Sequence, residues 1–128
     1  MSEYSDSALL RGIAERIGKA NVAHAAALLV KRAEALQEAH RLAYAFAEAE
    51  PELRRVRLFG SLLPGRNYRD DSDIDMAVEG GNIFSFIKIA EVSPCSVDVV
   101  DLAGLREGMA DRVRNEGVVL YEKDCRRF

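Results

Sequence analysis

Two aspartates and a Gly-Ser pair form a pattern that suits reactions at a phosphate group. Asp73 and Asp75 open one apolar run, and Gly60-Ser61 ends an earlier one, with eleven residues between Ser61 and Asp73. Because successive side chains of a strand point to opposite faces, Asp73 and Asp75 share a face that Ile74 does not. Adjacent carboxylates repel each other unless a cation lies between them. Oxygen ligands without a nearby His or Cys favour Mg²⁺ over zinc, so the pattern predicts a magnesium site.

A third aspartate, Asp98, is the one charge inside the apolar run Val97–Val100. A charge within an apolar strand is costly and needs an explanation. If this strand lies beside the strand of Asp73 and Asp75, all three carboxylates point to one face and predict a two-metal site for displacement at phosphorus. We then expect Asp73 and Asp75 to bridge two Mg²⁺ ions, and Asp98 to bind only the ion that activates the acceptor hydroxyl. The alternative is a solvated strand end with one hydrogen-bonded aspartate.

The Gly-Ser pair and the arginines after it are candidate ligands of a triphosphate. Gly60 would let the backbone approach the phosphates without a Cβ, and the Ser61 N–H and hydroxyl could donate to phosphate oxygens. An arginine of the following loop, Arg66 or else Arg69, could neutralise a leaving pyrophosphate. The alternatives are an ordinary turn serine and a solvated basic edge. We therefore assign Gly60, Ser61 and Arg66 to triphosphate binding, with Arg69 left open.

These residues would be positioned by an α+β domain with a small mixed sheet. Runs of apolar and β-branched residues bounded by turn formers predict strands at 56–59, 74–78, 97–100 and 118–121. The run Ile83–Ala90 predicts a short buried helix, although its apolar density also permits a strand. The amphipathic run Leu102–Glu116 predicts a helix that Gly117 ends.

The first 50 residues are rich in Ala and predict a helical extension of two helices, followed by a second domain at 51–128. The first helix would end at Gly18, and the second would begin near Asn21 and end before Pro51, a length of about 28 residues or 42 Å at 1.5 Å per residue. Its apolar residues form two adjacent lines. One line is Val22, Ala26, Leu29, Ala33, Leu36, His40, Ala43 and Ala47, and the other is Leu28, Ala35, Ala39, Leu42 and Phe46. So broad a face favours homo-oligomerisation through these helices, the alternative being an N-terminal cap on one domain.

Composition restricts the class of protein and its partners. Of 128 residues, 48% are hydrophobic and 30% charged, which is typical of a globular chain. A net charge of −3 argues against binding to a nucleic-acid backbone, and no apolar stretch approaches the ~18–20 residues of a membrane span. Cys95 and Cys125 are far apart, and no leader peptide is visible at the polar N-terminus. We expect a cytoplasmic protein with reduced thiols.

The run Phe59–Ser61, continued by Asp71–Asp75 and then by Val97–Val100, resembles the minimal nucleotidyltransferases of the DNA polymerase β-like superfamily. The similarity extends from Arg55 to about Lys123. It is specific as a combination, since Gly-Ser or Asp-x-Asp alone is common. The spacer is longer than usual, and Leu-Pro-Gly-Arg ending at Arg66 replaces the family's Ala-Arg-Gly.

The resemblance implies transfer of a nucleoside monophosphate, usually AMP from ATP, to a hydroxyl with the help of Mg²⁺. It assigns residues 51–128 as the nucleotidyltransferase domain. Several such proteins are antitoxins that adenylylate a tyrosine of a helical HEPN-type partner, and others modify small molecules. The alternative is a non-catalytic partner-binding protein or nucleotide-binding subunit that keeps the fold. We expect an enzyme, because a scaffold gains nothing from three mutually repelling carboxylates.

Overall fold

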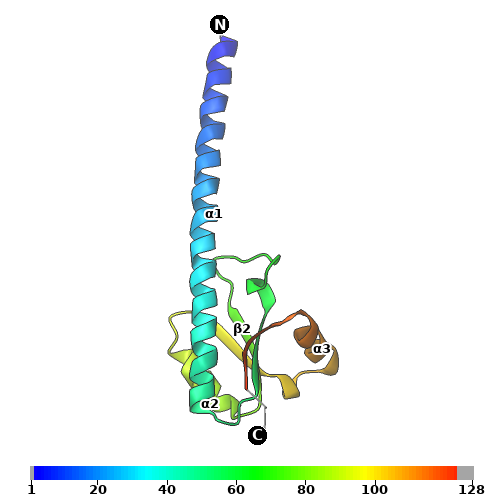
Figure 1. Cartoon of the computed structure of the whole chain (residues 1–128). Helices are drawn as coiled ribbons and strands as arrows, with labels where there is room; N and C mark the ends of the chain where they lie inside the picture. Colours follow the sequence, from blue (N-terminus) through cyan, green and yellow to red (C-terminus); the bar gives the residue numbers. More distant parts are fainter. Residues whose placement is uncertain (1, 124–128) are drawn as a thin grey trace.

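The computed structural model describes the backbone of residues 2–123 and the side chains of residues 18–123. It combines one long helix with a four-stranded mixed sheet and two short helices, which confirms the predicted α+β fold (Figure 1). In chain order the elements are α1 (Ser2–Ala49), β1 (Arg55–Phe59), the 3-10 turn η1 (Gly60–Leu62), β2 (Ile74–Glu79), α2 (Ile83–Glu91), β3 (Val97–Asp101), the 3-10 turn η2 (Leu102–Gly104), α3 (Glu107–Glu116) and β4 (Val118–Glu122). Cys125 lies outside the described residues.

The sheet has the strand order β3-β2-β1-β4. Strand β1 is antiparallel to both of its neighbours, whereas β2 and β3 are parallel and are joined by α2. A parallel pair needs such a crossover, and its register puts residues of β2 and β3 side by side. All four predicted strands are therefore confirmed, and the run Ile83–Ala90 forms a helix rather than a strand.

Helices α1 and α2 cover one face of the sheet and enclose the main core. Of the two apolar lines predicted along α1, the one with four buried residues lies against the sheet, joined by Ala43 of the other line. The small alanines let the helix lie close to the strands, and Phe46 of α1 packs against Phe86 of α2 with ring centroids 5.0 Å apart. The buried residues of this core on α1 and on the inner strands are Ala35, Ala39, Leu42, Ala43, Phe46, Val56, Leu58, Ile74, Met76 and Val78.

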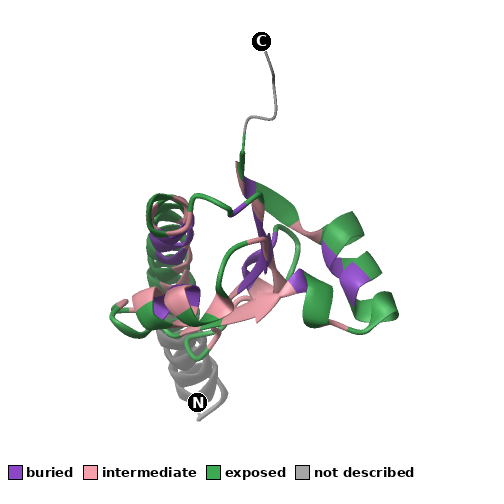
Figure 2. Ribbon diagram, turned by 90° about the horizontal axis from the view of Figure 1, so that it is seen from below, coloured by how far each residue is buried: buried purple, intermediate pink, exposed green. Residues whose placement is uncertain are grey.

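Helix α3 lies on the opposite side of the sheet from α1 (Figure 2). Ala110 and Val113 of α3 pack with Ala77 and Leu102 in a smaller second core. Because side chains alternate along a strand, Asp75 lies on the same face as Ala77. That face is only partly covered, since Asp98 of β3, level with Asp75, is exposed.

Where the sequence predicted two N-terminal helices, the structure has one uninterrupted helix of 48 residues, about 72 Å long at 1.5 Å per residue. Gly18 lies within it without a positive φ. A helical glycine costs only about 1 kcal/mol relative to Ala, too little to end a helix in Ala-rich surroundings. Val22 and Leu29 are 70% and 68% exposed, and this half of α1 projects beyond the sheet (Figure 1). None of the helices in the described part of the chain has the length and apolar character needed to cross a membrane.

Candidate functional site

The structure places two of the three predicted carboxylates side by side, with the third, Asp73, close enough to act on Asp75 through its charge. Asp75 on β2 and Asp98 on β3 are register partners in the parallel pair, so their side chains leave the same face of adjacent strands. Such strands lie about 4.8 Å apart. Asp73 lies one residue before the start of β2 and lines a neighbouring pocket of about 310 Å³ between α1 and the loop ahead of β2.

The electrostatics of this group are unfavourable in the absence of a cation. Burial, together with the charges of Asp98 and Asp73, raises the pKa of Asp75 from its ordinary value of 3.8 to about 6. Among the described residues, no hydrogen-bond donor or basic side chain contacts these three carboxylates. The charged form of Asp75 is therefore stabilised by neither solvent nor protein to the usual extent.

Gly60 lies directly against the carboxylate of Asp75. Its φ is +82°, a conformation that other residues rarely adopt, and a Cβ at this position would lie 2.1 Å from Asp75 Oδ2. Any side chain there would displace the carboxylate. Ser61 follows in η1 and is half-buried, at the same end of β1. The Gly-Ser turn and the aspartates, far apart in the sequence, thus lie next to each other.

The two candidate arginines occupy different surroundings. Arg66 lines a pocket of about 230 Å³ that Gly60 also lines, and its Nη2 donates to Glu116 Oε2 of α3 at 2.9 Å. Arg69 does not line this pocket, and its backbone N–H donates to the Ser72 hydroxyl at 2.8 Å. Arg66 is therefore the better placed of the two to meet a ligand bound beside Gly60.

Sequence reasoning missed the way α1 holds the loop between the Gly-Ser turn and β2. Arg32 Nη2 donates to the Leu62 carbonyl at 2.9 Å, and Lys31 Nζ forms an ion pair with Asp70 Oδ1 at 3.1 Å. Adjacent basic residues next to the apolar line of the helix are the only signal for these contacts. Because Leu62 and Asp70 are far from this helix in sequence, that signal does not indicate which residues Lys31 and Arg32 contact.

The arrangement of the carboxylates suits an Mg²⁺ ion that is shared with a bound phosphate. It does not suit an ion enclosed by protein ligands alone. Within the described residues, no group of three His, Cys, Asp or Glu side chains is arranged to enclose a metal ion. Mg²⁺, however, is usually held by one or two carboxylates together with substrate phosphates and waters. The register pair Asp75 and Asp98, which has no cationic partner in the part of the chain that the structure describes, supplies two such carboxylates.

Comparisons with known proteins agree with this geometry. Residues 43–126 match the family described as polymerase beta, nucleotidyltransferase. A chain of a toxin–antitoxin crystal structure with AMP-PNP has a TM-score of 0.54 and 26% identity, over 66% of this chain and 73% of that one. A nucleotidyltransferase structure from Sulfolobus solfataricus, itself assigned only provisionally, has a TM-score of 0.52 and 25% identity, over 75% of this chain and 87% of that one.

A third structure, of a tri-AMPylated Shewanella oneidensis HEPN toxin in complex with an MNT antitoxin, has a TM-score of 0.52. It is 22% identical over 70% of this chain and 73% of that one, a similarity that shows the fold alone. No curated protein sequence matches the chain. The family match covers more than half of the chain and includes the Gly-Ser turn and all three aspartates. The chain therefore belongs to the polymerase beta nucleotidyltransferase family, within which it has the fold of the minimal nucleotidyltransferases.

Proposed function

We propose that this protein is an Mg²⁺-dependent enzyme that transfers a nucleoside monophosphate, AMP from ATP, to a hydroxyl acceptor. The observation that carries the proposal is the register pair of Asp75 and Asp98 beside Gly60, two carboxylates that repel each other and have no cationic partner among the described residues. Family membership supplies the class of reaction.

In this proposal Asp73, Asp75 and Asp98 hold two Mg²⁺ ions. Bound Mg²⁺ would offset the negative charge of the phosphates and make the acceptor hydroxyl more acidic. The reaction breaks the bond between the α-phosphorus and the oxygen that bridges it to the β-phosphate, and it forms a bond from the α-phosphorus to the acceptor oxygen. Pyrophosphate leaves, and the hydroxyl proton is lost to solvent.

The Gly-Ser turn and Arg66 would orient the triphosphate. Gly60 lets the backbone of the turn lie directly against the carboxylate of Asp75, so a phosphate bound at this turn would lie beside that carboxylate. Ser61 offers a backbone N–H and a hydroxyl as donors. Arg66 adds a guanidinium at the rim of the adjacent pocket.

We further propose that the acceptor is a tyrosine of a helical HEPN-type partner and that the pair forms a toxin–antitoxin system in the cytoplasm. Support comes from solved structures with similar chains, two of whose descriptions name a toxin–antitoxin assembly and an AMPylated HEPN toxin with its MNT antitoxin. The pockets beside Asp73 and beside Gly60 measure only about 310 and 230 Å³, at or below the lower end of the range for drug-sized ligands, and both are open to solvent. A macromolecular acceptor fits such an open surface.

The projecting half of α1 would associate two copies of this chain. Val22, Leu29 and Val30 are between 58% and 70% exposed, and a helix without packing partners is only marginally stable in water. The double substitution Val22→Glu and Leu29→Glu should convert a dimer to a monomer in sedimentation experiments. An unchanged sedimentation coefficient would contradict this part of the proposal.

The test of the transferase proposal uses the full chain, a purified helical HEPN-type protein as the acceptor, Mg²⁺ and ATP labelled at the α-phosphate. Label is expected on the partner with the wild-type protein and is expected to be absent with Asp75→Ala. Asp111→Ala, an exposed aspartate of α3 paired with Arg114, is the matched control and should transfer label normally.

Two other outcomes would redirect the proposal. Label that comes only from the γ-phosphate would indicate phosphoryl transfer instead. A stable complex with the partner but no transfer of either label would favour the non-catalytic partner-binding alternative.

A further inference from the structure

The pocket beside Gly60 has an apolar floor and a charged rim. It measures about 230 Å³ and is bordered by the end of β1, the loop after it and α3. Phe59, Leu63 and Val113 supply apolar surface, while three charged side chains lie at the rim: Arg66, Arg112 and Glu116. Pockets for drug-sized ligands usually measure about 300–1,000 Å³, so this one suits part of a nucleotide rather than the whole.

The three charges of the rim are not equivalent. Arg66 and Glu116 form an ion pair at 2.9 Å in which both side chains are close to half exposed. Ion pairs of this kind contribute about 0–1 kcal/mol, so a more highly charged anion can displace the carboxylate. Arg112 has no hydrogen bond or ion pair with any described residue. The rim therefore presents one guanidinium without a partner among the described residues and one that is held by a weak counter-ion.

The pocket also lies on the catalytic side of the proposed site. Gly60 borders both the pocket and the carboxylate of Asp75. Helix α3 packs on Ala77, which shares the face of Asp75, so the pocket and the carboxylates open on the same side of the sheet. A phosphate chain whose α-phosphate lies beside Asp75 can continue past Gly60 into this pocket.

We propose that the pocket binds the β- and γ-phosphates of the nucleotide, that Arg112 of α3 is a phosphate-binding residue, and that Glu116 is a displaceable counter-ion that holds Arg66 until the nucleotide binds. This inference rests on the transferase function proposed above. Guanidinium groups suit the task because they donate two parallel hydrogen bonds to phosphate oxygens and stay charged. In this arrangement α3 is part of the nucleotide site as well as a cover for the sheet.

The direct test is titration calorimetry of the full chain with Mg²⁺ and ATP, comparing wild type with Arg112→Ala. Because hydrogen bonds to charged groups contribute about 1.5–3 kcal/mol, the variant should bind ATP about ten- to a hundredfold more weakly. Adenosine, which has no phosphates, should show no difference between the two proteins. The matched control is Arg114→Ala, since Arg114 lies on the same helix but pairs with Asp111 at 3.0 Å and does not line the pocket.

The role of Glu116 gives a second, opposite result. Glu116→Gln removes the competing carboxylate, so ATP should bind about three- to tenfold more tightly. Combining Glu116→Gln with Arg66→Ala should remove that gain. Circular dichroism and thermal unfolding of each variant establish that it is folded before binding is compared.

Failure of this inference is distinguishable from failure of the proposed function. If ATP binds in a manner that Asp75→Asn abolishes, while Arg112→Ala and Glu116→Gln both match wild type, the pocket does not hold the phosphates but the transferase proposal stands. If wild-type protein binds neither Mg²⁺ nor ATP, both fall together. If Arg114→Ala weakens ATP binding as much as Arg112→Ala, the effect is one of overall charge, and the assignment of Arg112 is wrong.

Discussion

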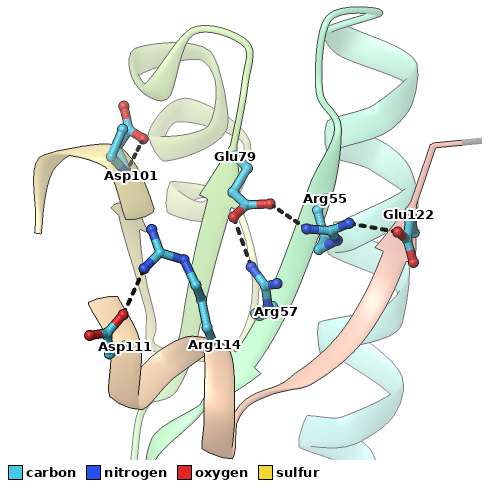
Figure 3. A network of polar contacts seen from close by, with 8 residues as sticks. Arg55, Arg57, Glu79, Asp101, Asp111, Arg114 and Glu122 are labelled. Carbon is cyan, nitrogen blue, oxygen red and sulfur yellow. Dashed lines mark hydrogen bonds and ion pairs between the residues drawn. The ribbon is translucent and has the colours of Figure 1, made fainter. Parts of the chain in front are cut away.

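Two groups of charged residues lie on the same face of the sheet, near opposite ends of β1 and β2. The paired cluster comprises Arg55, Arg57, Glu79 and Glu122, and the acidic cluster comprises Asp73, Asp75 and Asp98. In the paired cluster Glu79 accepts from both arginines, at 3.0 and 2.9 Å, and Glu122 accepts from Arg55 at 2.6 Å (Figure 3). The acidic cluster has no such partner among the described residues.

The two clusters differ in how their charges are balanced. The paired cluster sums to zero charge and satisfies its own hydrogen bonds, so Arg57 is buried with only 9% of its surface exposed. The acidic cluster carries a formal charge of −3, and burial together with these like charges raises the pKa of Asp75. Charges that the protein itself leaves unbalanced require a cation from solution. Substitutions that remove one charge from either cluster test this contrast.

The largest expected effect is on activity in the acidic cluster. Asp75→Asn keeps the shape of the side chain but removes the charge that would bind Mg²⁺, so the rate of nucleotidyl transfer should fall by about 10³-fold, equivalent to about 4 kcal/mol. The measurement is a single-turnover assay with α-labelled ATP at saturating Mg²⁺. Arg57→Met in the paired cluster should alter the rate less than threefold. Equal losses in the two variants would remove the distinction between the clusters.

The next largest effect is on stability in the paired cluster. Arg57→Met leaves the largely buried Glu79 with one arginine instead of two, and breaking a buried ion pair is strongly destabilising. We expect the free energy of unfolding in urea to fall by about 2–3 kcal/mol, less than for a fully isolated pair because Arg55 still donates to Glu79. The double variant Arg57→Met with Glu79→Gln should recover part of the loss. No change in the urea midpoint would show that the cluster is solvated rather than structural.

How far the sequence foretells these clusters depends on the range of the interactions. The Asp-x-Asp spacing and the lone Asp98 in an apolar strand predict the acidic cluster, because strand alternation is a local rule. The parallel pairing of β2 and β3 then sets Asp98 level with Asp75. In contrast, the sequence shows only that Arg55 and Arg57 alternate with apolar residues, and it does not reveal that both meet Glu79 across the strand pair.

The N-terminal helix shows the same limit. Its apolar lines are visible in the sequence, and the line through Leu42 and Phe46 does lie in the core. Its continuity through Gly18 is not visible, because the cost of a glycine and the gain from surrounding alanines differ by little. The contact from Arg32 to the Leu62 carbonyl spans 30 residues and depends on how the finished helix lies on the sheet.

A smaller effect concerns pH and stability without metal. Asp75 has a pKa of about 6 in the folded protein against 3.8 ordinarily, so the folded state binds this proton more tightly than the unfolded state. The associated stability is fully present below pH 3.8 and is lost as pH rises through 6. Discounted for partial exposure, the wild type should lose about 1 kcal/mol relative to Asp75→Asn between pH 4.5 and 7.5.

Chemical denaturation of both proteins in a chelator measures this difference directly, because all other titrating groups are common to the two. Adding Mg²⁺ at pH 7.5 should stabilise the wild type and leave Asp75→Asn unchanged. A wild type that gains stability relative to the variant as pH rises would reverse the sign and contradict the assignment of Asp75 as a carboxyl whose pKa is raised by burial and by like charges.

The smallest effect is expected at the exposed edge of the paired cluster. Arg55 and Glu122 form a short ion pair, but 33% of the arginine side chain and 56% of the glutamate side chain remain exposed. Solvent and salt screen such a pair, so Glu122→Gln should cost less than about 0.5 kcal/mol and the loss should disappear in 1 M NaCl. A double-mutant cycle with Arg55→Gln, followed by urea denaturation, isolates the pairwise energy.

A second double-mutant cycle, with Arg57 and Glu79, separates hydrogen bonding from burial as the reason that the two clusters differ. If the coupling of Arg55 with Glu122 matches that of Arg57 with Glu79, geometry alone determines the strength of each pair, and burial adds nothing. A coupling energy several times larger for the pair of Arg57 and Glu79 would show that exclusion of water strengthens the interactions between charges on this face of the sheet. The same exclusion of water acts on Asp75, which has no cationic partner among the described residues; it raises the pKa of this carboxyl and favours binding of a cation.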